Sequence, residues 1–139
     1  MIILVSPAKR QAGSGEGSLL PACAEATEAP FQREAEELRE KLSTLSECEL
    51  ASLFSLSEKK AGELYQVFQG NLVRRRALDL FRGPAFGALL GDGVPAGLCD
   101  TIGSSLRILS GLYGMLRPFD AVASHRLEIE RNIDRRLRR

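Results

Sequence analysis

The sequence predicts an α/β (α+β) fold in which helices pack on a small mixed sheet, and three observations support this prediction. A continuous aliphatic run at residues 2–5 ends at Pro7, as expected of a short strand buried on both faces. Between residues 31 and 69, apolar side chains recur every three or four positions, the period of helices that cover a core. After Asp120, residues 125–130 alternate between uncharged and charged side chains, the period of a strand.

Length and composition favour one globular domain, residues 1–139, because domains commonly span roughly 100–200 residues. Cys23, Cys48 and Cys99 are widely spaced and form no CxxC pair, and His125 is the single histidine. Neither a disulfide framework nor a zinc site is therefore expected, and we expect no metal and no cofactor. The cysteine usage favours a reducing, cytoplasmic compartment. Because no run of 18 apolar residues occurs, we expect no membrane span.

The charges are distributed unevenly along the chain, whose net charge is +1. Residues 1–69 carry seven Lys or Arg against eleven Asp or Glu, whereas residues 70–139 carry twelve against seven. This asymmetry permits a basic surface on a nearly neutral protein. Part of the excess lies in residues 131–139, which are expected to form a basic tail.

The first strand delivers Lys9 and Arg10 just after Ser6 and Pro7. A Ser and a Lys at the carboxyl end of a strand are a common way to bind an anion, although a solvated turn lysine is the more frequent outcome. The following stretch, residues 11–30, is rich in Gly, Ser, Ala and Pro and is expected to form a mobile loop.

Three helices are expected next. The first is amphipathic and covers residues 31–42. A capping box that begins at Ser46 starts the second helix. Ser55 or Ser57 caps the third helix, which ends at Gly70.

The second half of the chain is expected to contain a further long helix at Ser104–Leu116. Four leucines recur there at steps of three and four, and Gly111 and Gly114 would allow close approach of another backbone. Pro118 ends this helix, and Asp120 caps the turn that follows. A basic run and a short helix come earlier, and Pro84 argues against a central strand beside them. The basic run consists of Arg74, Arg75 and Arg76, and the short helix covers Ala77–Phe81.

Three segments resemble the YaaA family of bacterial peroxide stress proteins, also classified as UPF0246 and DUF328. The segment ILSGLYGMLRPFDAVASHRLEI resembles the family's LSGLYG, LRP, D and RLE series. MIILVSPAK resembles its first strand and SPAK turn, and ALDLFRGPAFGALL resembles its AxxAFxG segment. The chain departs from the family at Ser124-His125, where the family has Pro-Tyr, and at Arg10, where it has Thr. The resemblance covers the amino-terminal half of the family only, so the chain is expected to be shortened.

The resemblance implies a protein that limits hydroperoxide damage, lowers free iron and binds DNA through a helix-hairpin-helix-like motif. Nothing in this sequence indicates iron ligation. The matching residues are Ser55, Ser57, Lys59 and Lys60, where free helix amides, a hydroxyl and two ammonium groups would hold a phosphate. Contacts to the backbone of double-stranded DNA would be independent of sequence. The alternative is a helical pair whose lysines are simply solvated.

A second hypothesis is an enzyme that acts on a phosphorylated or nucleotide substrate. Arg126 and Glu128 share one face of a predicted strand, and Lys9 joins them if the two strands are neighbours. Such a cleft would bind phosphate and perform acid–base chemistry, but a structural ion pair explains the same pattern. Because no nucleophile and base pair is apparent, the sequence leans against an enzyme. A third hypothesis is a shortened family member whose incomplete sheet needs a partner chain.

Overall fold

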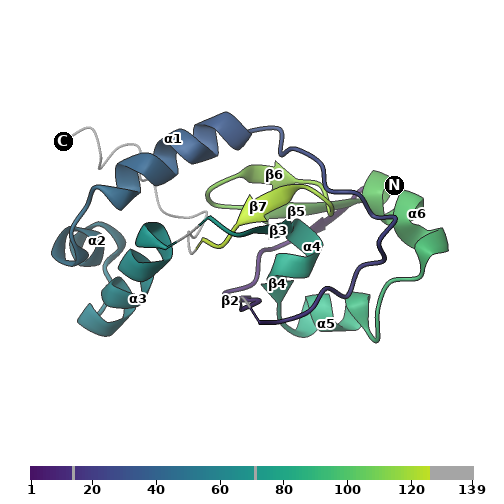
Figure 1. Cartoon of the computed structure of the whole chain (residues 1–139), viewed down its shortest axis with the longest axis horizontal. Coiled ribbons are helices and arrows are strands. Elements are labelled where there is room, and N and C mark those ends of the chain that lie inside the picture. Colours follow the sequence, from purple (N-terminus) through teal and green to yellow (C-terminus); the bar gives the residue numbers. More distant parts are fainter. Residues whose placement is uncertain (14, 71, 126–139) are drawn as a thin grey trace.

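The structure is a computed structural model that describes residues 1–13, 15–70 and 72–125. It divides into a helical part, residues 32–69, and a sheet part formed by the other described residues (Figure 1). The helical part contains α1 (Gln32–Ser43), α2 (Glu47–Phe54) and α3 (Glu58–Gln69). Helices on small mixed sheets confirm the predicted α/β class.

The sheet part contains three small sheets. The largest has the order β1-β5-β6, with β1 parallel to β5 and β6 antiparallel to it. Two antiparallel pairs complete the part, β2 with β4 and β3 with β7. The strands are β1 (Ile3–Val5), β2 (Arg10–Gln11), β3 (Arg74–Arg76), β4 (Phe81–Arg82), β5 (Leu106–Ser110), β6 (Gly114–Leu116) and β7 (Ala121–Ala123). The helices are α4 (Ala77–Leu80), α5 (Pro84–Leu90), the 3-10 turn η1 (Ala96–Leu98) and α6 (Cys99–Ser105).

The first strand forms as expected, but the expectation that it is buried on both faces is wrong. Ile3 is 45% exposed and Leu4 is 60% exposed. The reason is that β1 lies at the edge of its sheet, with β5 as its single strand neighbour among the described residues.

The helix expected over Ser104–Leu116 is wrong: α6 ends at Ser105, and β5 and β6 form a hairpin instead. Burial in β5 has a period of two, because Leu106, Ile108 and Ser110 are buried whereas Arg107 and Leu109 are half-buried. Gly114 has φ +69°, and a Cβ added there would lie 3.1 Å from the Phe31 ring. This glycine thus lies in a hairpin, and its close neighbour is a side chain and not the backbone that was expected to pack against a helix.

The predicted helices of residues 31–69 are confirmed. Ser46 and Glu49 form the expected capping box at the start of α2. Ser57 is the N-cap residue of α3, but the expected cap is wrong in one respect, because the Ser57 side chain forms no cap hydrogen bond. Gly70 follows the last residue of α3. Phe31, the first residue of the first predicted helix, precedes α1 and is 49% exposed.

The short helix expected before Pro84 is present as α4, and Pro84 occupies the first turn of α5 rather than a strand. Proline suits that position because the first helical amides need no partner within the helix. The strand pattern after Asp120 begins at His125, and residues 126–139, including the basic tail, lie outside the described residues.

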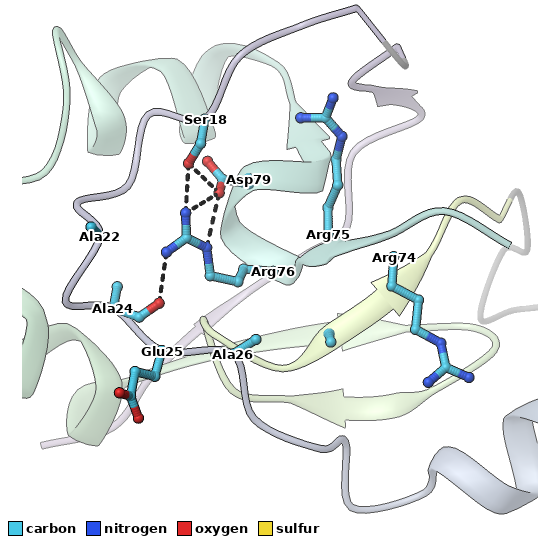
Figure 2. A pocket seen from close by; sticks show the side chains of 10 residues that line it. Ser18, Ala22, Ala24, Glu25, Ala26, Arg74, Arg75, Arg76 and Asp79 are labelled. Atoms are coloured by element: carbon cyan, nitrogen blue, oxygen red, sulfur yellow. Dashed lines mark hydrogen bonds and ion pairs between the residues drawn. The ribbon is translucent and has the colours of Figure 1, made fainter.

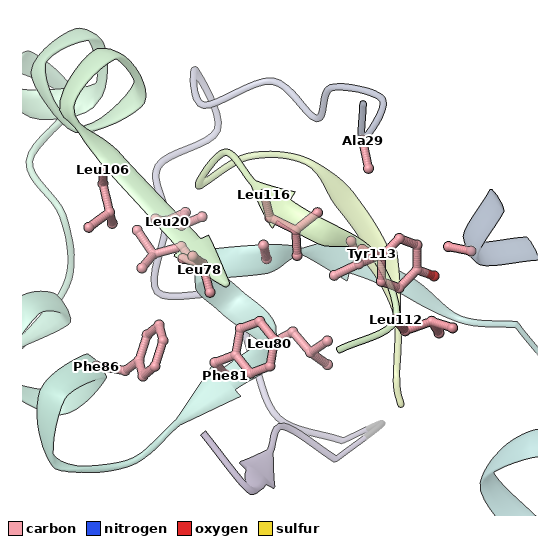
Figure 3. Packing of buried hydrophobic residues seen from close by; sticks show 14 of the residues in the cluster. Leu20, Ala29, Leu78, Leu80, Phe81, Phe86, Leu106, Leu112, Tyr113 and Leu116 are labelled. Atoms are coloured by element: carbon pink, nitrogen blue, oxygen red, sulfur yellow. The ribbon is translucent and has the colours of Figure 1, made fainter. Parts of the chain in front are cut away.

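The hydrophobic core joins the strands to the short helices of the sheet part (Figure 3). The rings of Phe81 and Phe86 are tilted against each other with centroids 5.6 Å apart. Tyr113 and Leu116, from the β5–β6 hairpin, are buried beside them. Arg39 connects the two parts, because it donates to the carbonyl of Val67 on α3 at 2.7 Å and to that of Ser124 at 2.9 Å.

Two buried carboxylates attach the 11–30 loop to the sheet part. Asp79 accepts hydrogen bonds from the Ser18 hydroxyl at 2.6 Å and from the Leu19 amide at 2.9 Å. Asp120 accepts from the Thr27 hydroxyl at 2.6 Å and, as predicted, caps its turn by accepting from the Arg117 amide at 2.7 Å. The loop therefore has several fixed points, and its mobility stays a prediction.

Candidate nucleic-acid interface

The predicted DNA-binding residues lie at the tip of a helical hairpin formed by α2 and α3. The two helices pack through buried side chains, Leu50 and Phe54 from α2 and Ala61 and Leu64 from α3. This apolar contact fixes the angle at which the connecting turn is presented. The hairpin lies at one end of the molecule, away from α6 (Figure 1).

The turn between the helices is made by Ser55, which adopts a left-handed conformation with φ 51° and ψ 50°. The Leu56 amide donates to the Ala51 carbonyl at 2.9 Å and closes the end of α2. A left-handed residue other than glycine costs roughly 1–2 kcal/mol. The conformation leaves the side chains of Ser55 and Ser57 exposed.

The amino terminus of α3 lies in this exposed turn. Among the described residues, the Ser57 hydroxyl caps none of these amides, although the Ser57 carbonyl accepts from the Ala61 amide at 2.9 Å. Lys59 and Lys60 are exposed in the same turn. The four predicted residues therefore lie within one exposed tip, which we call the α3 tip: Ser55, Ser57, Lys59 and Lys60. Free amides and ammonium groups at a helix start attract anions.

The positive charge is confined to this tip. Glu58 lies within the tip, between Ser57 and Lys59, and three further glutamates lie elsewhere on the hairpin: Glu47, Glu49 and Glu63. Glu49 is held by the capping box, where hydrogen bonds from the Ser46 amide and hydroxyl lower the pKa of its carboxyl. An approaching polyanion would thus find a small basic surface bordered by carboxylates, which limits the number of phosphates bound.

The residues of the second predicted site are not all described. Lys9 is exposed and follows β1. Arg126 and Glu128 lie outside the described residues, so a cleft formed by these three side chains stays a prediction.

Within the basic run, Arg75 and Arg76 contact the 11–30 loop, whereas the Arg74 side chain points away from it (Figure 2). Arg74 pairs with Glu36 on α1. Arg75 donates to the carbonyls of Gly13 at 2.8 Å and Glu16 at 2.6 Å. The run lines a pocket of about 400 Å³ whose wall includes Ser18 and Asp79, and both of these accept from Arg76.

Sequence reasoning missed a buried pair formed by Ser110 and His125. The His125 Nε2 lies 2.9 Å from the Ser110 Oγ, and its Nδ1 lies 2.8 Å from the Ala123 carbonyl. Because a carbonyl can only accept, Nδ1 carries the proton and Nε2 accepts from the serine hydroxyl. Burial lowers the pKa of His125 to about 4, so the ring is neutral at pH 7.

The Ser110 hydroxyl also organises the β5–β6 turn. Its Oγ accepts from the amides of Leu112 at 3.2 Å and Tyr113 at 3.1 Å. Ser110 is 4% exposed and His125 is 2% exposed. The pair therefore holds the turn in place, and the signal for it was the polar serine inside the LSGLYG segment.

Two further properties concern the described part of the chain. Within it, no helix combines the length and apolar character needed to cross a membrane. Nor do His, Cys, Asp and Glu gather there in groups of three or more that would hold a metal ion.

Comparison with known proteins agrees with the resemblance seen in the sequence. The family model described as peroxide stress protein YaaA matches residues 1–138. A UPF0246 protein of Teredinibacter turnerae is 36% identical over 135 residues, which cover 93% of this chain and 51% of that protein. A UPF0246 protein of Lactobacillus delbrueckii subsp. bulgaricus is 33% identical over 132 residues, which cover 94% of this chain and 51% of that protein. The chain thus spans about half the length of these relatives, and it belongs to the peroxide stress protein YaaA family.

Proposed function

We propose that this protein protects cytoplasmic DNA during peroxide stress by contacting the DNA backbone through the α3 tip. Family membership supports the peroxide stress role. The observation that carries the DNA contact is the exposed start of α3, where Ser55, Ser57, Lys59 and Lys60 surround uncapped amides.

The proposed contact uses general properties of phosphate. Phosphate oxygens accept hydrogen bonds from the amides at the start of α3, and the serine hydroxyls donate further bonds. Lys59 and Lys60 neutralise the phosphate charge and release bound counterions. No base edge is required, so the binding is independent of sequence.

Charge reversal at the tip tests the contact. We expect Lys59→Glu/Lys60→Glu to weaken binding to labelled duplex DNA roughly tenfold or more, because two attractive contacts become repulsive. The matched control is Arg33→Glu/Lys41→Glu, which changes the net charge equally on the exposed side of α1. Equal loss in both variants would show that only net charge matters and would contradict the proposal.

The survival of bacteria after treatment with hydrogen peroxide tests the stress role separately from DNA binding. In a bacterial strain that lacks its own family member, expression of this chain is expected to raise survival after hydrogen peroxide. The tip variant is expected to protect less than the α1 control at equal protein levels. Full protection by the tip variant would show that peroxide resistance does not require the α3 tip and would contradict the proposal.

A further inference from the structure

The sheet β1-β5-β6 has one face in the core and a second face that is largely uncovered. Three buried side chains from β5 and β6 define the core face: Leu106, Ile108 and Leu116. Figure 3 shows that Leu106 and Leu116 point into the core. Because side chains alternate along a strand, the residues between these positions point to the opposite face of the sheet.

The residues of this opposite face are mostly apolar and exposed. In the sheet register, Leu4 lies beside Arg107, and Leu109 lies beside Met115. Leu4 is 60% exposed, Met115 is 48% exposed, and Leu109 is half-buried. We call the surface that these residues form the outer face: Leu4, Arg107, Leu109 and Met115.

The guanidinium group of the outer face is bound at its border. The Arg107 Nη1 donates to the carbonyl of Gly103 at 3.0 Å and to that of Leu106 at 2.6 Å. Both carbonyls lie where α6 ends and β5 begins. Because its charge is directed there, the outer face favours an apolar polypeptide surface over a nucleic acid or another polyanion.

The strand β1 adds an open edge to the outer face. Its single strand neighbour among the described residues is β5, and the two strands are parallel. Parallel strands are normally covered on both faces. Residues 2–5 include no charged residue and no proline, which are the residue types that commonly prevent an edge strand from pairing with another chain. An uncovered apolar face beside such an edge is typical of a surface that another polypeptide covers.

The comparisons with known proteins indicate which polypeptide this is. The matched residues make up 51% of each of the two UPF0246 relatives described above, so those proteins contain about as many residues again. The family fold therefore includes a second half, and the outer face belongs to the first.

We propose that the outer face and the β1 edge bind the half of the family fold that this chain does not span, and that they bind it also when it is a separate polypeptide. The proposal does not rest on the DNA contact, because the outer face belongs to the sheet part and the α3 tip belongs to the helical part. Either proposal can therefore fail without the other.

Co-expression of the two polypeptides tests the interface. This chain is produced together with the unmatched half of the Teredinibacter turnerae relative, so that the half can fold in contact with it. We expect one complex that holds one copy of each polypeptide, with its mass measured by light scattering after gel filtration. Recovery of this chain without the half would overturn the proposal. A dimer of this chain that lacks the half would do the same, because it would assign the outer face to a second copy.

Variants locate the contact on the outer face. Leu4→Glu/Met115→Glu places two carboxylates in the apolar contact and is expected to reduce the yield of complex roughly tenfold or more. The matched control is Leu72→Glu/Val73→Glu, which changes two exposed apolar residues between α3 and β3 and should leave the yield unchanged. Circular dichroism of each variant alone checks that it is folded. Equal yields from the two variants would overturn the proposal.

Hydrogen exchange locates the contact without any substitution. In the complex of the parent chain, we expect slower amide exchange in the peptides that contain β1 and β6 than in this chain alone. Protection that is confined to the helical part would overturn the proposal, because the second half would then bind away from the outer face.

Discussion

In the helical part, many of the stabilising hydrogen bonds join residues close in the chain, whereas in the sheet part they join residues far apart. The capping box of α2 connects Ser46 with Glu49, which is three positions away. In the sheet part, Ser18 bonds to Asp79 across 61 positions and Thr27 bonds to Asp120 across 93. The difference suggests that the exposed α3 tip can be altered with little effect on folding, whereas the buried polar groups of the sheet part cannot.

The largest effect on stability is expected at Asp120, which is fully buried. The Asp120 carboxylate accepts hydrogen bonds from the Thr27 hydroxyl and the Arg117 amide. In Asp120→Asn, an NH2 group replaces one carboxylate oxygen, so it faces one of these donors and cannot accept from it. We expect a loss of roughly 3 kcal/mol in the free energy of unfolding, measured by urea titration. The control Asp92→Asn, at an exposed turn, should change it by less than about 0.5 kcal/mol.

Acid should weaken the sheet part through His125. Its folded pKa is lowered from 6.5 to about 4, so the unfolded chain binds a proton first as the pH falls. Stability is therefore complete above pH 6.5 and decreases as the pH falls towards 4, by about 2 kcal/mol between pH 7 and pH 5. Urea titrations at these two pH values measure the loss. His125→Gln should remove most of this dependence, and an unchanged dependence would exclude His125 as its source.

A smaller effect is expected in the helical part. Ser46→Ala removes the hydroxyl that accepts from the Glu49 amide at 3.3 Å. Loss of an N-cap costs about 1 kcal/mol, which thermal unfolding can resolve. Ser52→Ala, on the exposed side of the same helix, is the control and should be nearly neutral. Equal losses in the two variants would contradict a specific role for the cap.

These differences explain how much of the molecule could be predicted from sequence. The helices of the helical part were predictable because caps and apolar spacing are local signals, as at Ser46 and Gly70. The β5–β6 hairpin was not, because leucines at steps of three and four fit both a helix and two short strands joined by a turn. Gly114 did not distinguish them, because the sequence does not reveal that the Phe31 ring lies against it.

The candidate sites divide in the same way. The α3 tip was predictable because its four residues are nearly consecutive and follow one turn. The Ser110–His125 pair was not, because only the tertiary structure brings these two distant residues together. The exposure of β1 also depends on which strands lie beside it, and its aliphatic run does not reveal that.

The smallest effect on stability is expected at the α3 tip, where Lys59→Ala/Lys60→Ala should change the free energy of unfolding by less than about 0.5 kcal/mol. Urea titration of this variant beside the parent chain checks the expectation. A loss as large as that of Asp120→Asn would remove the distinction between the two parts.

The most direct test of the account is the salt dependence of duplex DNA binding by the parent chain and by this tip variant. Because two lysines contact phosphate, the slope of log affinity against log salt should be about 2 units steeper for the parent chain. We expect the variant to remain folded, to show the shallower slope and to lose most of its affinity for DNA. Equal slopes and equal affinities would contradict the claim that the α3 tip binds the DNA backbone.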